Sequence, residues 1–295
     1  MSNVPETEFY QVMAEESTYG VAPASITTIL GRLKSTNSRI ANNNQGFGGI
    51  SNGLNDAQLN PTSLQETSIS QTFDLINGYF LKLLLGTMTG NGTVGDSYNY
   101  ACANTLPSIV IEDAYNLATD EVIRFLGCYP KKAVIKASIG QLATVTIDWE
   151  SSNSTSGHTY QTITPISGNA YEFINGTFEK PSSTTLTEIQ EFTLNIDFTV
   201  KRNGGIGSTT SVIKVHKRKF SGSFKRLLND STSMTEARNN SDIATIMLNF
   251  TSGDKYLKIL IENITTDYDR NTEEEKSTEE TVTFQALTVS ATEVI

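Results

Sequence analysis

Apolar and polar residues alternate along much of this chain, and that pattern predicts β-strands. The clearest case is Ile189–Val200, where every second residue from Phe192 onward is apolar and the residues between them are polar. A second case is Leu142–Ser151, in which the set containing Val145 and Ile147 is apolar and the other set is largely Thr and Asp. Successive side chains of a strand point to opposite faces, so both segments predict an antiparallel sheet with one apolar and one wet face.

Segments rich in β-branched and aromatic residues extend the strand prediction to most of the chain. A Ser-Gly-Asp turn between Ile243–Phe250 and Lys255–Asn263 predicts a β-hairpin. The other predicted strands are Ile26–Leu33, Ser108–Asp113, Asp120–Tyr129, Lys131–Ser138, Ser211–Phe220 and Thr281–Val289.

One stretch, residues 70–86, predicts a helix instead. Apolar residues recur at helical spacing from Leu75 to Leu84 and make one stripe. Thr72 or Asp74 would cap the start with a side-chain oxygen, and Gly86 would end the helix in the left-handed conformation. A one-faced helix needs a sheet to lie on. The predicted fold class is therefore mainly β, with antiparallel sheets organised around this helix.

Two polar stretches predict long loops. Residues 87–105 are polar and contain Tyr98 and Tyr100, and residues 37–61 are dense in Asn and Gly. Long loops of this kind are either disordered or used for contacts. The apolar residues of the second loop favour contacts, and the candidates are Phe47, Ile50 and Leu54.

The chain has 295 residues and a formal net charge of −10 at pH 7. That length allows one large domain or two of ordinary size. Stable binding to nucleic acid requires a basic face, so the overall charge disfavours it. An acidic surface does suit a protein that nucleic acid passes without sticking.

Charge is gathered into blocks of opposite sign. A basic block accompanies the predicted strand Ser211–Phe220, and residues 267–280 form an acidic loop. Contact with phosphate is one interpretation of the basic block. Contact between copies accounts better for the two blocks together, because one chain carries both signs. The candidate contact residues are Lys214, Lys217, Arg218 and Lys219 in the basic block and Glu273, Glu274 and Glu275 in the acidic one.

The sequence lacks the signatures of common catalytic and metal sites. His158 and His216 are the two histidines, and neither lies in a nucleophile or metalloprotease motif. Cys102 and Cys128 lack zinc-site spacing; they either pair or are two buried free thiols, and we expect the thiols. We predict no enzyme activity, no cofactor and no metal. An N-terminus without a signal peptide and the absence of a membrane-spanning segment predict a protein made in the cytoplasm, without membrane insertion.

The two halves of the chain share an order of elements. The segment 108–113, SIVIED, is similar to 258–263, KILIEN, and 144–149, TVTIDW, is similar to 281–286, TVTFQA. The pattern predicts an internal duplication with two β domains, residues 1–165 and 166–295. The alternative is that any antiparallel protein contains such strands.

Several stretches together resemble the tail tube proteins of tailed viruses, in particular around residues 12–152. Cys128 stands where that family has a Gly-Cys step, and the closing VTFQA is also similar. The stretches are ESTYGVAPA at 16–24, FDLINGYFLKLLLG at 73–86, LPSIVIED at 106–113 and VIRFLGCYPKKAVIKASIGQLATVTIDWES at 122–151.

The resemblance implies a structural protein of the virion tail. The implied fold is an antiparallel β-sandwich or half-barrel with a flanking α-helix. Tail tube subunits assemble into stacked rings that form a channel for genome DNA during ejection. The rings are hexamers, or trimeric pseudo-hexamers where each chain carries two tube domains, as a duplication here would require. The implied partners are further copies of the chain, the tape measure, tail tip and terminator proteins, and DNA in transient, non-specific passage. The alternative is a monomeric carbohydrate- or surface-binding β-sandwich module, which would share the strands and the acidity.

Overall fold

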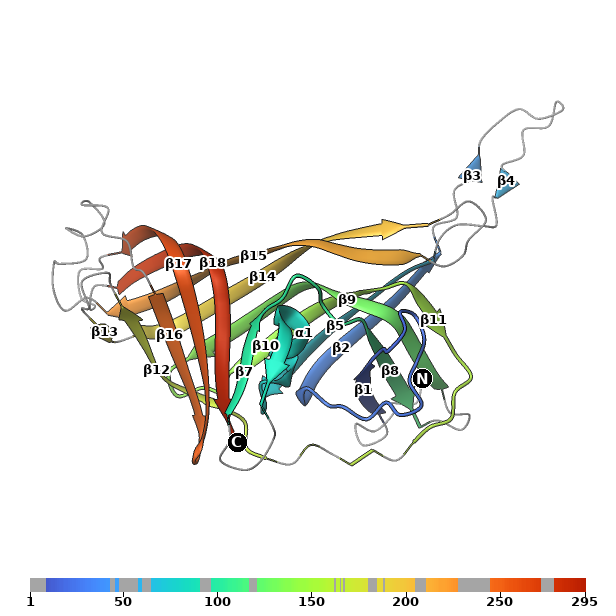
Figure 1. The fold of residues 1–295 in the computed structure, drawn as a ribbon, viewed down its shortest axis with the longest axis horizontal. Helices are drawn as coiled ribbons and strands as arrows, with labels where there is room; N and C mark the ends of the chain where they lie inside the picture. The colour runs from blue at the N-terminus through green and yellow to red at the C-terminus, as the bar shows by residue number, and fades with distance from the viewer. Residues whose placement is uncertain are drawn as a thin grey trace.

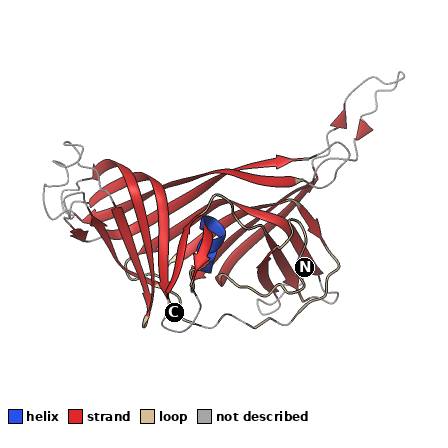
Figure 2. Ribbon diagram, in the orientation of Figure 1, coloured by secondary structure: helices blue, strands red, loops and turns tan. Residues whose placement is uncertain are grey.

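The computed structural model describes most of the chain, and strands dominate it (Figure 2). The mainly β prediction is therefore confirmed. The described residues are 9–42, 46–47, 58–59, 65–90, 97–116, 121–161, 163–164, 166, 168–179, 185–187, 189–204, 211–227, 245–271 and 279–295.

One large antiparallel sheet runs through the molecule and curls into a half-barrel (Figure 1). A small hairpin of β6 (Gly86–Thr89) and β7 (Ser97–Cys102) extends it beside β18. In hydrogen-bonded order the strands are β13 (Thr185–Thr187), β12 (Glu172–Glu179), β16 (Thr245–Ser252), β17 (Lys255–Asn271), β18 (Glu279–Val294), β15 (Val212–Leu227), β14 (Ile189–Asn203), β9 (Glu121–Ser138), β10 (Thr144–Ser151), β5 (Gln65–Leu75) and β2 (Gly31–Asn42).

Strand β9 belongs to two layers. Its first half pairs with β8 (Ile109–Tyr115) and β11 (Asn153–Thr155), and β1 (Phe9–Glu15) pairs with β8. Its second half pairs with β10 and β14. Where β9 changes partners, Lys131 forms a β-bulge beside Pro130. Proline has no N–H to donate, and a bulge is a position at which a sheet tolerates the loss of that hydrogen bond. The β1–β8 layer then contacts β2, since Gln11 Nε2 donates to Thr36 Oγ1 at 2.9 Å.

The apolar faces predicted from alternation form the core. The buried side chains alternate with partly exposed ones along β10 and along most of β14, as predicted. A single cluster of buried apolar residues draws on both halves of the chain. Representative members are Ile69, Phe73, Val145, Ile147, Trp149, Leu194, Ile196, Leu248 and Ile259.

The helix predicted at residues 70–86 is wrong over most of its length. Strand β5 occupies Gln65–Leu75, and the helix α1 spans only Tyr79–Leu85. Strand β2 pairs with β5 from Gln65 to Leu75 and β10 pairs with it from Thr67 to Asp74, and the inward residues of β5 then follow a period of two. The predicted end is confirmed, because Gly86 adopts the left-handed conformation at φ 107°. The helix is also more buried than a one-faced stripe, since Leu81 and Leu85 are buried as well.

Other boundaries also differ from the prediction, mostly because strand pairing continues into stretches of loop-like composition. The strand predicted at Ile26–Leu33 begins only at Gly31 and extends to Asn42. The predicted loop at 37–61 therefore starts as strand and also holds a two-residue ladder of β3 (Gly46–Phe47) and β4 (Gln58–Leu59). The predicted loop at 87–105 contains the β6–β7 hairpin. The two strands predicted between 120 and 138 are the single strand β9, and the acidic stretch 267–280 is strand up to Asn271 and again from Glu279.

The two cysteines are free thiols in different surroundings. Cys128 is buried, as expected, and burial raises the pKa of its thiol. Cys102 is exposed at the end of β7, so the expectation that both are buried is wrong for this residue.

Candidate assembly surface

The polar side chains of the main sheet form one continuous face. The register aligns a row of alternating charge across four adjacent strands: Asp148 on β10, Lys132 on β9, Asp197 on β14 and Lys219 on β15. Opposite charges on directly opposed residues attract across a sheet. The next row carries no charged side chain and consists of Thr72, Thr146, Val134, Asn195, Ser221, Gln285 and Thr265.

This polar face is hollowed between β14 and β17. A concavity of about 550 Å³ lies there, and its lining is mainly hydroxyl and amide groups. Asp267 adds one negative charge to the lining. The described part of the polar face is thus hydrophilic and of mixed charge, without the continuous run of cations that tight phosphate binding requires.

Strands β14 and β15 continue past their neighbours as a two-stranded arm, which we define as residues 198–203 and 212–219. The pairing of β14 with β9 ends at Asp197, and the pairing of β15 with β18 begins at Phe220. Within the described chain, the ladder partners of the arm strands are therefore each other. The arm extends along the long axis of the molecule toward the end at which β11 lies (Figure 1).

The predicted basic block lies on this arm, and its residues differ in where their side chains point. Lys214, Lys217 and Lys219 are exposed. Arg218 instead points into the chain: Nη1 donates to the carbonyl oxygens of Leu84 and Leu85, both at 2.7 Å, and Nη2 donates to that of Ala103 at 2.8 Å. The last carbonyls of a helix have no partner within it and carry partial negative charge. Arg218 therefore anchors the root of the arm to the end of α1.

A groove of about 610 Å³ lies between the arm and residues 102–106. Its basic lining comes from the arm, through Lys214, His216 and Lys217. Its apolar lining includes Leu287 on β18, of which 79% is exposed to solvent. A surface that combines a large exposed apolar side chain with a cationic rim is typical of an interaction site.

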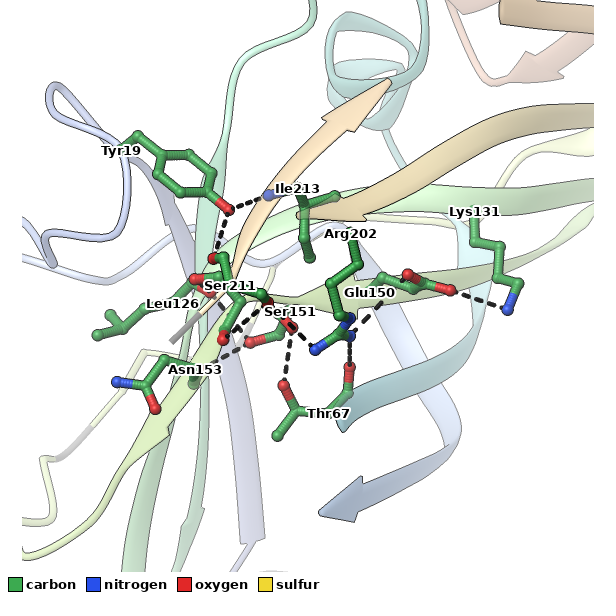
Figure 3. Close-up of polar contacts among 11 residues, drawn as sticks. Tyr19, Thr67, Leu126, Lys131, Glu150, Ser151, Asn153, Arg202, Ser211 and Ile213 are labelled. Atoms are coloured by element: carbon green, nitrogen blue, oxygen red, sulfur yellow. Dashed lines mark hydrogen bonds and ion pairs between the residues drawn. The ribbon is translucent and has the colours of Figure 1, made fainter. Parts of the chain in front are cut away.

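The tip of the arm is fastened to the body (Figure 3). The hydroxyl oxygen of Tyr19 accepts a hydrogen bond from the N–H of Ile213 at 2.7 Å, and Ser211 Oγ donates to the Ser152 carbonyl at 3.3 Å. Arg202 Nη1 donates to Ser211 Oγ at 3.3 Å, and its other terminal nitrogen lies 3.9 Å from Glu150. The arm is held at both root and tip.

Sequence reasoning missed the buried carboxylate of Glu293 near the end of β18. It accepts hydrogen bonds from Gly78 N at 2.8 Å, from the Tyr100 hydroxyl at 2.7 Å and from the Tyr171 hydroxyl at 3.0 Å. Burial, together with this carboxylate, raises the pKa of both tyrosines. Glu293 thus caps the start of α1 from the far end of the chain. No local signal predicts this, because the segment around Glu293 looks like an ordinary strand end.

The structure brings together only part of the predicted contact set. Three lysines of the basic block share the arm, whereas Phe47 lies apart in β3. Ile50, Leu54, Glu273, Glu274 and Glu275 lie outside the described residues.

Within the described residues, no three His, Cys, Asp or Glu side chains gather in a way that could hold a metal ion. No described helix has the length and apolar character needed to cross a membrane.

Comparison with known protein families gives one match over nearly the whole chain. A family model described as phage tail tube protein matches residues 10–286. The match runs from β1 into the closing strand β18 and therefore includes the arm and the polar face. A comparison with curated proteins found none that matches the chain.

Proposed function

The chain belongs to the phage tail tube protein family, and we propose on that basis that its copies assemble into stacked rings around a channel for genome DNA. The family consists of structural proteins of the virion tail, and it implies self-assembly and contact with other tail proteins. We further propose that those other proteins are the tape measure, tail tip and terminator proteins. The chain is made in the host cytoplasm and has no enzyme activity.

The observation that carries the proposal is the continuous polar face of the curled sheet. In a ring, this face would line the channel and the apolar face would remain in the core. DNA would pass along hydroxyl and amide groups, such as those of Thr146, Asn195 and Ser221, which offer no fixed cationic track. In the adjacent row, Lys132 lies between Asp148 and Asp197, so this part of the channel wall would carry no net positive charge and would hold DNA weakly.

The ends of the sheet support closure between copies. The described strand order ends at β2 on one side and at β13 on the other. Open edges expose unpaired backbone groups and invite pairing with another chain, and closure into a barrel removes them. Contact of two different edges is heterologous, so it repeats from copy to copy until a ring closes.

The arm supports a second contact between copies. Lys214, Lys217 and Lys219 would meet the acidic segment of a neighbour that contains Glu273, Glu274 and Glu275. The arm extends toward one end of the long axis, and the end of β17 and the start of β18 lie at the other (Figure 1). Opposite charges at opposite ends favour a head-to-tail arrangement. Phe47, Ile50 and Leu54 are proposed as further contact residues on the evidence of the sequence.

The symmetry of the ring depends on the proposed duplication. Two tube domains, residues 1–165 and 166–295, would make a ring of three chains with pseudo-sixfold symmetry. Without the duplication, six chains would form the ring. One sheet and one core join the described residues of both halves, so any two such domains would act as one rigid subunit.

Negative-stain electron microscopy with light scattering on the same sample tests the proposal. We expect rings or tubes with a central hole, and class averages that separate threefold from sixfold symmetry. A protein that stays monomeric, even when a tail-tip complex is added, would overturn the proposal and favour the monomeric binding module.

A further inference from the structure

The tip of the arm is fastened by a residue of the N-terminal segment, and we propose that this residue, Tyr19, is a latch that sets the direction of the arm for contact between copies. The inference rests on the proposed function, because it concerns how the arm meets a neighbour. It assigns Tyr19 a positioning role: the tyrosine acts through the arm.

The contact between Tyr19 and the arm is specific. Its hydroxyl accepts the N–H of Ile213 at 2.7 Å and lies 3.5 Å from the carbonyl oxygen of Ser211, to which it donates. Ile213 is only 2% exposed, so its N–H has no access to bulk water and needs a partner. The neighbouring strand β18 supplies none, because its pairing with β15 begins at Phe220. Tyr19 takes the place of that missing strand.

Tyr19 is itself held rigidly against the bend in β9. Its ring stacks on Tyr129, with 6.0 Å between the ring centroids. The two carboxylate oxygens of Glu16 accept the N–H groups of Gly20 and Gly127, each at 2.8 Å. The stretches ESTYGVAPA and FLGCYP, about a hundred residues apart in the sequence, therefore meet at this point.

Gly127 makes the close approach of Tyr19 feasible. It has a φ of +60°, a conformation that residues with a side chain rarely adopt. A Cβ at this position would lie 2.8 Å from the Tyr19 ring and 2.5 Å from Ser152 Oγ. The glycine thus leaves the space that the tyrosine ring fills.

Other polar contacts at the tip are longer than the tyrosine contact, among them those of Arg202 Nη2 with the Thr67 carbonyl oxygen at 3.5 Å and with Glu150 at 3.9 Å. Both the N–H and the hydroxyl of Ser211 reach the Ser152 carbonyl, at 3.5 and 3.3 Å. A two-stranded hairpin alone is only marginally stable in water, so the course of the arm beyond its root depends on its contacts with the body, of which the Tyr19 contact is the shortest in the described part of the chain. Loss of the Tyr19 hydroxyl should loosen the tip while Arg218 still holds the root.

The test compares the wild-type chain with Tyr19→Phe, which keeps the stacked ring and removes only the hydroxyl. Tyr115→Phe, in β8, is the matched control, because it removes a tyrosine hydroxyl from the β1–β8 layer, away from the arm. Hydrogen exchange followed by mass spectrometry reports opening of residues 211–219, and light scattering against concentration reports assembly. A thermal scan checks that each variant is folded.

We expect Tyr19→Phe to speed exchange in residues 211–219 about fivefold, the population change expected for one hydrogen bond, and to leave the rest of the chain unchanged. The concentration required for assembly should rise by a similar factor. Tyr115→Phe should change neither quantity. Unchanged exchange would show that Tyr19 does not fasten the arm. Faster exchange with unchanged assembly would show that the direction of the arm is irrelevant to contact between copies.

A second variant keeps the test decisive if Tyr19→Phe fails to fold. Ser211→Ala loosens the same tip from the side of the arm, without a change in the N-terminal segment, and should shift both quantities in the same direction by a smaller factor. If the wild-type chain does not assemble under any condition, the proposed function fails. The exchange comparison then still decides whether Tyr19 fastens the arm.

Discussion

Two ion pairs lie side by side on β15 and differ in their surroundings. Lys225 faces Glu191 on β14, with 3.4 Å between the charged atoms and about half of each side chain exposed. The next residue, Arg226, faces Glu280 on β18 at 2.6 Å, and the two side chains are 8% and 1% exposed. Adjacent residues of a strand point to opposite faces, so one pair lies on the polar face and the other in the interior.

The difference separates charges that maintain the fold from charges that are available for contacts. A buried pair is costly to break, because the remaining partner is left charged without water or a counter-charge. An exposed pair contributes little, because water already solvates both groups. Arg218 and Arg226 therefore stabilise the fold of the chain, whereas the exposed lysines of the arm are available for contacts with another molecule.

The largest effect is expected for Glu280→Ala. It leaves Arg226 buried without its counter-charge, and the free energy of unfolding should fall by about 3 kcal/mol or more. Urea denaturation followed by the fluorescence of Trp149, the one tryptophan of the chain, measures it. The double variant Arg226→Met with Glu280→Leu should recover much of the loss. A double variant as unstable as the single one would contradict the explanation.

A pH-dependent effect of intermediate size is expected for Asp113→Asn. Burial raises the pKa of the Asp113 carboxyl above its usual 3.8, although Gln11 Nε2 donates to it at 2.6 Å. The folded chain therefore keeps a proton that the unfolded chain releases, and stability falls as the pH rises through the window above 3.8. Asparagine removes this titration, so the stability of the variant relative to wild type should rise as the pH increases above about 4. Denaturation midpoints that keep a constant separation across this range would contradict the argument.

The smallest effect is expected for Lys225→Ala, which removes one partner of the exposed ion pair. Its pair with Glu191 is half solvated, so the free energy of unfolding should change by less than about 1 kcal/mol. The same denaturation experiment measures it beside Glu280→Ala. A loss as large as that for the buried pair would show that exposure does not separate the two roles.

Alternation along a strand was informative because it reports directly which side chains face the core. The faces of β10 and β14 were predicted from it, and their apolar residues are buried. The helix was predicted to start too early, because Thr72 and Asp74 are good capping residues just before the apolar stripe that begins at Leu75. Ile69, Phe73 and Leu75 also fit a period of two. Spacing alone does not decide between these periods, and the backbone partners on β2 and β10 do.

The sequence by itself determined the class of fold, the hairpin that turns at Gly253 and the family to which the chain belongs. Those features depend on neighbours in the sequence, or on patterns with a single period. Only the tertiary structure decided that Arg218 caps α1, that Glu293 closes its start and that Tyr19 fastens the arm. Each of these contacts joins residues more than a hundred positions apart, and their geometry exists only after the sheet has curled.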